Sequence, residues 1–88
     1  MKRTDANQAE IVEQLRAIGC TVQDLSGVGR GTPDILVGYR GLNLLMEIKT
    51  KTGRLNPRQV EWFTKWHGQS SVVTCFEDAL QVINGVTL

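Results

Sequence analysis

Asp34, Glu47 and Lys49 are the residues of this 88-residue sequence whose types and spacing most directly indicate chemistry. They stand at the outer ends of two apolar, β-prone segments, residues 34–39 and 42–49. Two such segments with a short turn between them are typical of a β-hairpin. The sequence therefore predicts that two carboxylates and one ammonium group meet where the strands of a hairpin end.

A two-residue turn at Arg40-Gly41 would place Asp34 directly opposite Glu47, with Cβ atoms about 4.5–5.5 Å apart. Side chains alternate between the two faces of a strand, so Lys49 would share a face with Glu47. Two carboxylates this close repel each other, and one of them would be driven to hold a proton. A bound divalent cation would remove that conflict.

Carboxylate and carbonyl oxygens are the ligands that Mg²⁺ prefers, and the backbone carbonyl of Ile48 could add a third ligand. Such an ion would polarise a phosphoryl oxygen and help to ionise an attacking water. Lys49 could orient that water or stabilise charge on the phosphate. The alternative is a Glu47–Lys49 ion pair on an exposed sheet face, with Asp34 as a turn residue. The apolar neighbours in both segments weigh against it.

The elements that would position these residues follow from apolar periodicity and from turn and capping signals. Helices are expected at residues 5–18, from 57 to near 68, and at 77–83, with strands at 20–25, 34–39, 42–49 and 71–75. Asp5 could cap the first helix, and Asn56 the second, with Pro57 at its first position. The order α-β-β-β-α-β-α predicts an α/β fold, a mixed sheet flanked by helices. Its last two strands should be parallel, because a helix connects them.

Size and composition predict one domain spanning residues 1–88, small enough to gain stability by pairing with a second copy. The sequence has neither an apolar run long enough for a membrane helix nor a signal peptide, so we expect a cytoplasmic protein with no membrane partner. The net charge is only +1, but residues 30–65 carry seven basic and three acidic side chains. A basic middle is typical of a phosphate-binding face.

Four basic residues are the candidates for contacts with a DNA backbone: Arg30, Lys51, Arg54 and Arg58. Arg30 lies between two glycines in the loop 26–32, where a flexible backbone could approach a phosphate. The other three flank the predicted active-site strand. Trp62 and Trp66 are four residues apart on a predicted helix. Stacking on each other or on the core is favoured over stacking on a base.

Pro33-Asp34, a hairpin and then Glu47-x-Lys49 resemble the active-site signature of the PD-(D/E)XK nuclease superfamily. Within it, the chain resembles a stand-alone VRR-Nuc domain of the kind found in bacteriophages, over nearly its whole length. The resemblance also includes the first helix and the following residues: Gly29-Arg30-Gly31, Gly53-Arg54-Leu55-Asn56, Gln59 and Trp62.

This resemblance implies a restriction-endonuclease-like core and a Mg²⁺- or Mn²⁺-dependent phosphodiesterase that acts on DNA. Asp34, Glu47 and the carbonyl of Ile48 would bind the metal, Lys49 would be catalytic, and Gln59 would support the site. Small stand-alone relatives resemble Holliday-junction resolvases in being homodimers. Branched DNA is therefore the expected partner, and the host cell cytoplasm the expected location if a phage encodes the chain.

The family usually adds an acidic residue from the first helix. Glu10 lies on the flank of the predicted apolar stripe, whereas Glu13 points almost directly away from it, so Glu10 is the candidate. Asn7, one turn earlier, could help or replace it, and Asp5 is a more distant alternative.

The leading functional hypothesis is a metal-dependent, structure-selective DNA endonuclease that resolves Holliday junctions. A nuclease for flaps or nicks, or a restriction-like enzyme, is the alternative among enzymes. A non-catalytic DNA-binding module of the same fold and a structural subunit are the alternatives outside enzymes. The presence of Asp34, Glu47 and Lys49 together weighs against the non-catalytic module.

Overall fold

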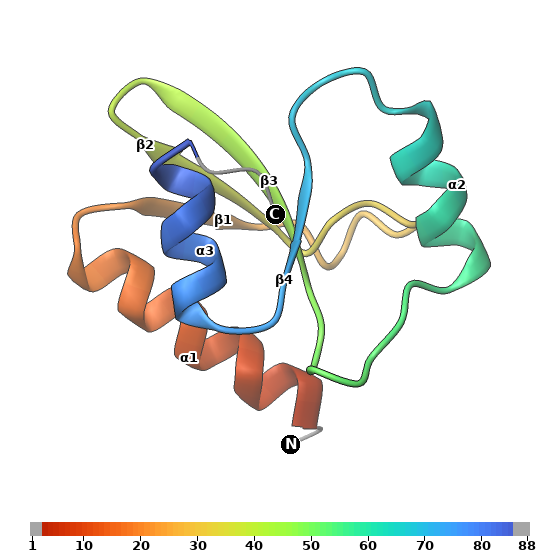
Figure 1. Cartoon of the computed structure of the whole chain (residues 1–88), viewed down its shortest axis with the longest axis horizontal. Helices are drawn as coiled ribbons and strands as arrows, with labels where there is room; N and C mark the ends of the chain where they lie inside the picture. The colour runs from red at the N-terminus through yellow and green to blue at the C-terminus, as the bar shows by residue number, and fades with distance from the viewer. Residues whose placement is uncertain (1–2, 86–88) are drawn as a thin grey trace.

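A four-stranded mixed sheet and three helices make up the fold in a computed structural model that describes residues 3–85 (Figure 1). The elements are α1 (Arg3–Ala17), β1 (Thr21–Asp24), β2 (Ile35–Tyr39), β3 (Leu42–Ile48), α2 (Pro57–Lys65), β4 (Ser71–Val73) and α3 (Phe76–Ile83). This is the predicted order, and the predicted α/β class with a mixed sheet is confirmed.

The strands lie side by side in the order β1-β2-β3-β4. The first three are antiparallel neighbours, and β4 runs parallel to β3, as the connecting helix predicted. In the central pair Tyr39 faces Leu42 and Ile35 faces Met46, so the register of the predicted two-residue turn is confirmed.

The turn between β2 and β3 has its characteristic backbone conformation. Arg40 has φ 48° and Gly41 has φ 79°. Two consecutive positive φ values match the turn whose twist suits a two-residue hairpin. A local feature of the sequence thus sets the register that brings residue 34 toward residue 47.

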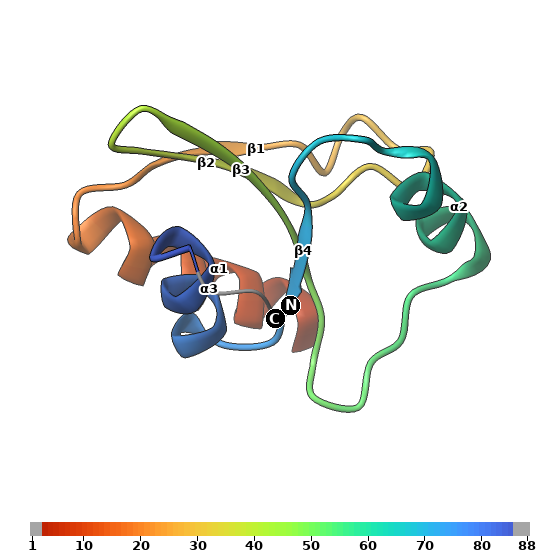
Figure 2. The same ribbon diagram turned by 45° about the horizontal axis from the view of Figure 1, so that its top comes forward.

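One face of the sheet packs against α1 and α3 to form the core. Ile11 and Leu15 of α1 are buried there against Ile35 of β2 and Met46 of β3. Both views show α2 on the other side of β4 from α1 and α3 (Figures 1 and 2), and α2 has no buried residue. Residue 47 alternates with Met46 and Ile48, so it faces away from this core.

Some predicted boundaries need correction. The first helix already includes Arg3, so Asp5 lies within it and the predicted N-cap at Asp5 is wrong. The second helix ends at Lys65 rather than near residue 68, whereas Asn56 caps its start as predicted. Within residues 3–85, no helix combines the length and the apolarity needed to cross a membrane.

Candidate active site

Asp34 lies immediately before β2, and its side chain contacts the end of β3. Its Oδ2 accepts a hydrogen bond of 2.8 Å from the backbone N–H of Ile48. Its own carbonyl accepts one of 2.8 Å from the backbone N–H of Leu25. The carboxylate therefore extends the link between β2 and β3 past the last paired residues. This anchored position differs from that of a free turn residue.

Glu47 is the buried charged residue of the described chain, with only 2% of its surface exposed. Its Oε2 accepts a hydrogen bond of 3.2 Å from Gln59 Nε2 and lies 3.7 Å from Lys49 Nζ. Its Oε1 is buried and has no hydrogen-bond partner among the described residues. Buried polar atoms are nearly always satisfied, so this oxygen indicates a missing partner.

Burial, together with the neighbouring Asp34 carboxyl group, raises the pKa of Glu47 from 4.5 to about 8, while the Lys49 ammonium opposes the shift. Burial disfavours the charged form of a carboxyl group, and a second negative charge nearby does the same. The repulsion expected from the sequence is therefore present in the fold. A cation between the two groups would favour the ionised form of both.

Lys49 follows β3, and its backbone is held on two sides. Its N–H donates to the carbonyl of Val73 at 3.0 Å, and its carbonyl accepts a hydrogen bond of 3.0 Å from Asn7 Nδ2. The same Asn7 amide reaches the carbonyl of Thr74 at 3.2 Å. Asn7 thus ties α1 to the ends of β3 and β4, while the Lys49 side chain keeps 17% of its surface exposed toward solvent.

The first-helix acid stays a prediction. The side chain of Glu10 is exposed and forms no hydrogen bond or ion pair with the part of the chain that the structure describes. Asn7 of α1 reaches the site through the Lys49 carbonyl, and Gln8 is one of four α1 residues that line a groove with Asp34. The sequence offered Asn7 as a residue that could help or replace Glu10, and no signal in it pointed to Gln8.

Gln59 joins the start of α2 to the site. Its side-chain Oε1 accepts from the backbone N–H of Asn56 at 2.9 Å, and Asn56 Oδ1 accepts from the backbone N–H of Gln59 at 2.9 Å. This reciprocal pair is a capping box. The Nε2 of the same side chain is left to hold Glu47. One residue therefore fixes the helix start and orients a carboxylate.

The donor set fits a hard divalent cation. The carboxylates of Asp34 and Glu47 are neighbours here, and the Oε1 atom of Glu47 is buried without a partner. No group of three or more His, Cys, Asp and Glu side chains suited to a metal was found in residues 3–85. Backbone carbonyls or water would have to complete the coordination. The Ile48 carbonyl remains the predicted third protein ligand.

The predicted DNA-binding residues fall into two groups. Arg30 and Arg58 line one groove beside α2, where Gly31 lies against the start of the helix. A Cβ on Gly31 would clash with the Arg58 carbonyl oxygen, so only glycine allows this approach. Lys51 and Arg54 are exposed on the connection between β3 and α2, outside that groove.

Among the comparisons with known proteins, the comparison with solved structures gives a match. A solved structure described as a VRR_NUC domain superposes with a TM-score of 0.72 and 30% sequence identity, over 96% of this chain and 97% of that one. No family profile matches the sequence. No curated protein matches it either.

Proposed function

This chain belongs to the VRR-Nuc family and is a nuclease-type domain, and from that premise we propose that it is a metal-dependent endonuclease that hydrolyses phosphodiester bonds in branched DNA. The observation that carries the proposal is the unpartnered, buried Oε1 of Glu47 beside Asp34 and Lys49. Such an arrangement costs stability unless a ligand occupies it.

The residues divide the work according to their chemistry. Asp34, Glu47 and the Ile48 carbonyl would hold Mg²⁺ or Mn²⁺, which when bound supplies a Lewis acid for the phosphate and lowers the pKa of the attacking water. Lys49, partly open to solvent, places a positive charge where charge develops on the phosphate. Gln59 holds the Glu47 carboxylate in one orientation.

DNA with a four-way junction is the proposed substrate, and a homodimer the proposed active form. Two sites related by a twofold axis would suit the symmetry of the junction. The exposed Arg30, Lys51, Arg54 and Arg58 would contact the DNA backbone, which positions DNA without reading its sequence.

The test is cleavage of a labelled four-way junction, a flap and a linear duplex in Mg²⁺, Mn²⁺ or EDTA. We expect metal-dependent, symmetric cutting of the junction, and a loss of at least about 100-fold in Lys49→Ala, because a positioned charge is removed from the reacting phosphate. Lys51→Ala is the matched control. It removes an equal, exposed charge two residues away and should weaken DNA binding while leaving the rate at saturating DNA close to wild type.

Each other outcome selects a different function. Preferential cutting of the flap would make the chain a flap-directed nuclease. Tight junction binding by wild type and Lys49→Ala, with no cutting of any substrate in either metal, would leave a non-catalytic DNA-binding module and overturn the proposal.

A further inference from the structure

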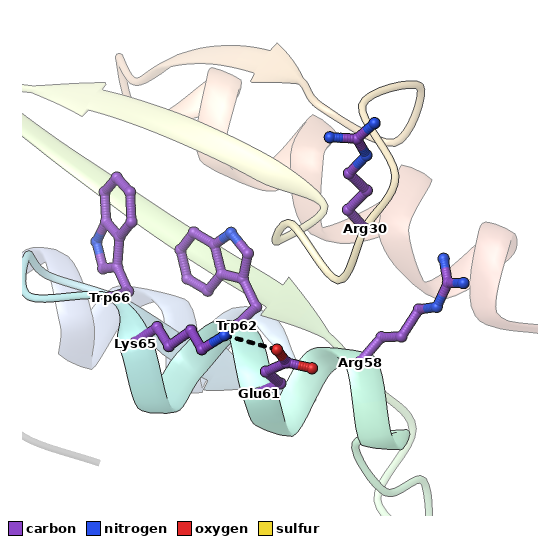
Figure 3. A pocket seen from close by; sticks show the side chains of 6 residues that line it. All are labelled: Arg30, Arg58, Glu61, Trp62, Lys65 and Trp66. Carbon is purple, nitrogen blue, oxygen red and sulfur yellow. Dashed lines mark hydrogen bonds and ion pairs between the residues drawn. The ribbon is translucent and has the colours of Figure 1, made fainter.

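A groove of about 460 Å³ runs along α2 beside the loop that precedes β2 (Figure 3). Its lining combines two aromatic rings, three cationic side chains and one carboxylate: Trp62, Trp66, Arg30, Arg58, Lys65 and Glu61. Except for Arg30, all of them come from α2 or its C-cap. Cleavage as proposed above uses the two arginines only as general contacts to the backbone and leaves both tryptophans without a role.

The rings of Trp62 and Trp66 are held in place by the protein itself. The rings of Trp62 and Trp66 stack with centroids 4.7 Å apart and an angle of 17° between their planes. Trp66 Nε1 donates to the carbonyl of Gln69 at 3.2 Å, which fixes the outer ring. Even so, 45% of Trp66 is exposed. A fixed, solvent-facing indole offers a stacking surface at little entropic cost.

The cationic side chains leave the groove with an excess of positive charge. Lys65 is paired with Glu61 at 2.7 Å. Arg30 and Arg58 form no ion pair and no side-chain hydrogen bond with the residues that the structure describes. Figure 3 shows both guanidinium groups at the end of the groove where α2 begins, with the tryptophans further along the helix. A guanidinium fork without a protein partner suits a phosphate.

The backbone of Arg30 is set for this position. It has φ 59°, in the left-handed region that non-glycine residues rarely adopt, and it stands between Gly29 and Gly31, which also have positive φ. Gly31 lies against the Arg58 carbonyl, so the loop is held close to the start of α2. The unusual conformation therefore accompanies the convergence of two arginines from segments distant in the sequence.

The groove lies along the same helix that reaches the candidate active site through Gln59. Arg58 precedes Gln59, whose side chain holds Glu47. From residue 59, the helical rise places Trp62 about 4.5 Å and Trp66 about 10.5 Å along α2. A strand whose phosphate lies at Glu47 and Lys49 would thus have its neighbouring nucleotides within reach of the groove.

We propose that this groove binds an unpaired nucleotide next to the cleaved phosphate, with its base on the tryptophan rings and its phosphate on Arg30 and Arg58. The inference rests on the proposed function and adds to it that a nucleotide at the branch point is unpaired when the strand is cut. A base within a duplex has both faces covered by its neighbours, whereas an unpaired base exposes a face to stack on an aromatic ring.

The sequence contains two tryptophans and both line the groove, so the tryptophan fluorescence of the chain reports on the groove. Intrinsic tryptophan fluorescence of the full chain is followed in EDTA, which removes the metal that the proposed cutting requires. The chain is titrated with single-stranded oligothymidylate or with a blunt duplex of equal phosphate count. We expect the single strand to quench the fluorescence and to bind at least fivefold more tightly than the duplex.

Two variants of Trp66 separate stacking from folding, with binding measured by anisotropy of a labelled strand. Both lose the hydrogen bond to Gln69, but Trp66→Phe keeps an aromatic face and Trp66→Leu does not. Because stacking on one aromatic side chain contributes on the scale of tenfold in affinity, Trp66→Leu should bind oligothymidylate at least about fivefold more weakly, and Trp66→Phe close to wild type. His67→Gln, at the exposed neighbouring residue, is the control and should not change binding.

The remaining outcomes are distinct. Equal binding by wild type and Trp66→Leu, with no quenching, would overturn the groove assignment even if the junction is cut. Quenching without any cutting would sustain the groove while the proposed nuclease fails. If Trp66→Leu changes the mass in solution and oligothymidylate quenches neither protein, the groove is an interface between copies of this chain and the proposal is wrong.

Discussion

Glu47 is the residue on which the chemistry of the site depends most. Its side chain is buried beside a second carboxylate, and one of its oxygens has no partner in the described chain. The nearby Lys49 ammonium, 3.7 Å from Oε2, only partly offsets this cost. A buried carboxyl group with an unsatisfied oxygen is typical of functional sites, where stability is lost in exchange for reactivity.

The pH dependence of stability should report this burial. In the metal-free protein the pKa of Glu47 is raised from 4.5 to about 8, so between these values the folded chain holds a proton that the unfolded chain has lost. The free energy of unfolding should therefore fall as the pH rises from about 5 to 8. Glu47→Gln cannot ionise and should show a flatter profile over the same range.

Urea unfolding in EDTA at several pH values measures this difference. Adding Mg²⁺ at pH 8 should stabilise the wild type and have little effect on Glu47→Gln, since a ligand of the folded state alone raises its stability. Parallel pH profiles for the two proteins would contradict the raised pKa, whatever their activity.

At the scale of elements, α2 differs from the other helices. It packs no buried residue into the core, and it is joined to the site through Gln59 and to the loop before β2 through the close approach of Gly31. Its capping box therefore serves two purposes, because the side chain that caps the helix also orients Glu47. The stability of the helix start and the geometry of the site are coupled.

Asn56→Ala should weaken both the start of α2 and the geometry of the site. Loss of an N-cap hydrogen bond costs about 1 kcal/mol, so amide hydrogen exchange across α2 should be about fivefold faster. Cleavage should fall as well, because the backbone N–H of residue 56 orients the Gln59 side chain and a loosened helix start holds it less firmly. Asn56→Asp keeps a good cap and is the matched variant that should restore both. Faster exchange with unchanged cleavage would separate the helix start from the site.

For the whole molecule, both the small size of the chain and the symmetry of the proposed substrate favour a dimer. One chain has a mass of 9.8 kDa and extents of 33 × 32 × 23 Å, so a single copy offers one site and a limited surface for a four-way junction. A second copy would supply the opposite site. We therefore predict that the chain forms a dimer and that paired cutting of a junction depends on that dimer.

Light scattering at micromolar concentration should give about twice the monomer mass of 9.8 kDa. Mixed dimers of wild type and Lys49→Ala should then nick one strand of a junction where the wild type cuts two, since each site acts on its own strand. A monomeric mass together with paired cutting would show that symmetry does not come from a stable dimer.

The sequence alone was sufficient for the hairpin and for the residues at its ends. The apolar, β-prone segments, the turn at Arg40-Gly41 and the positions of Asp34 and Glu47 are local features, and their consequences follow from strand geometry. The element order and the parallel pair β3 and β4 follow from connectivity. The cap at Asn56 was predicted from its own segment. The cap at Asp5 was wrong because polar residues at a helix start do not by themselves determine where the helix begins.

Only the tertiary structure decided which distant groups meet. It buries Glu47, brings Asn7 to the Lys49 carbonyl across 42 positions of sequence, and sets Arg30 beside Arg58. Nothing in the sequence near any of these residues specifies its partner. Such contacts arise when the helices pack on the sheet, because a side chain's burial, and with it the pKa and the unsatisfied oxygen of Glu47, depends on neighbours from other elements.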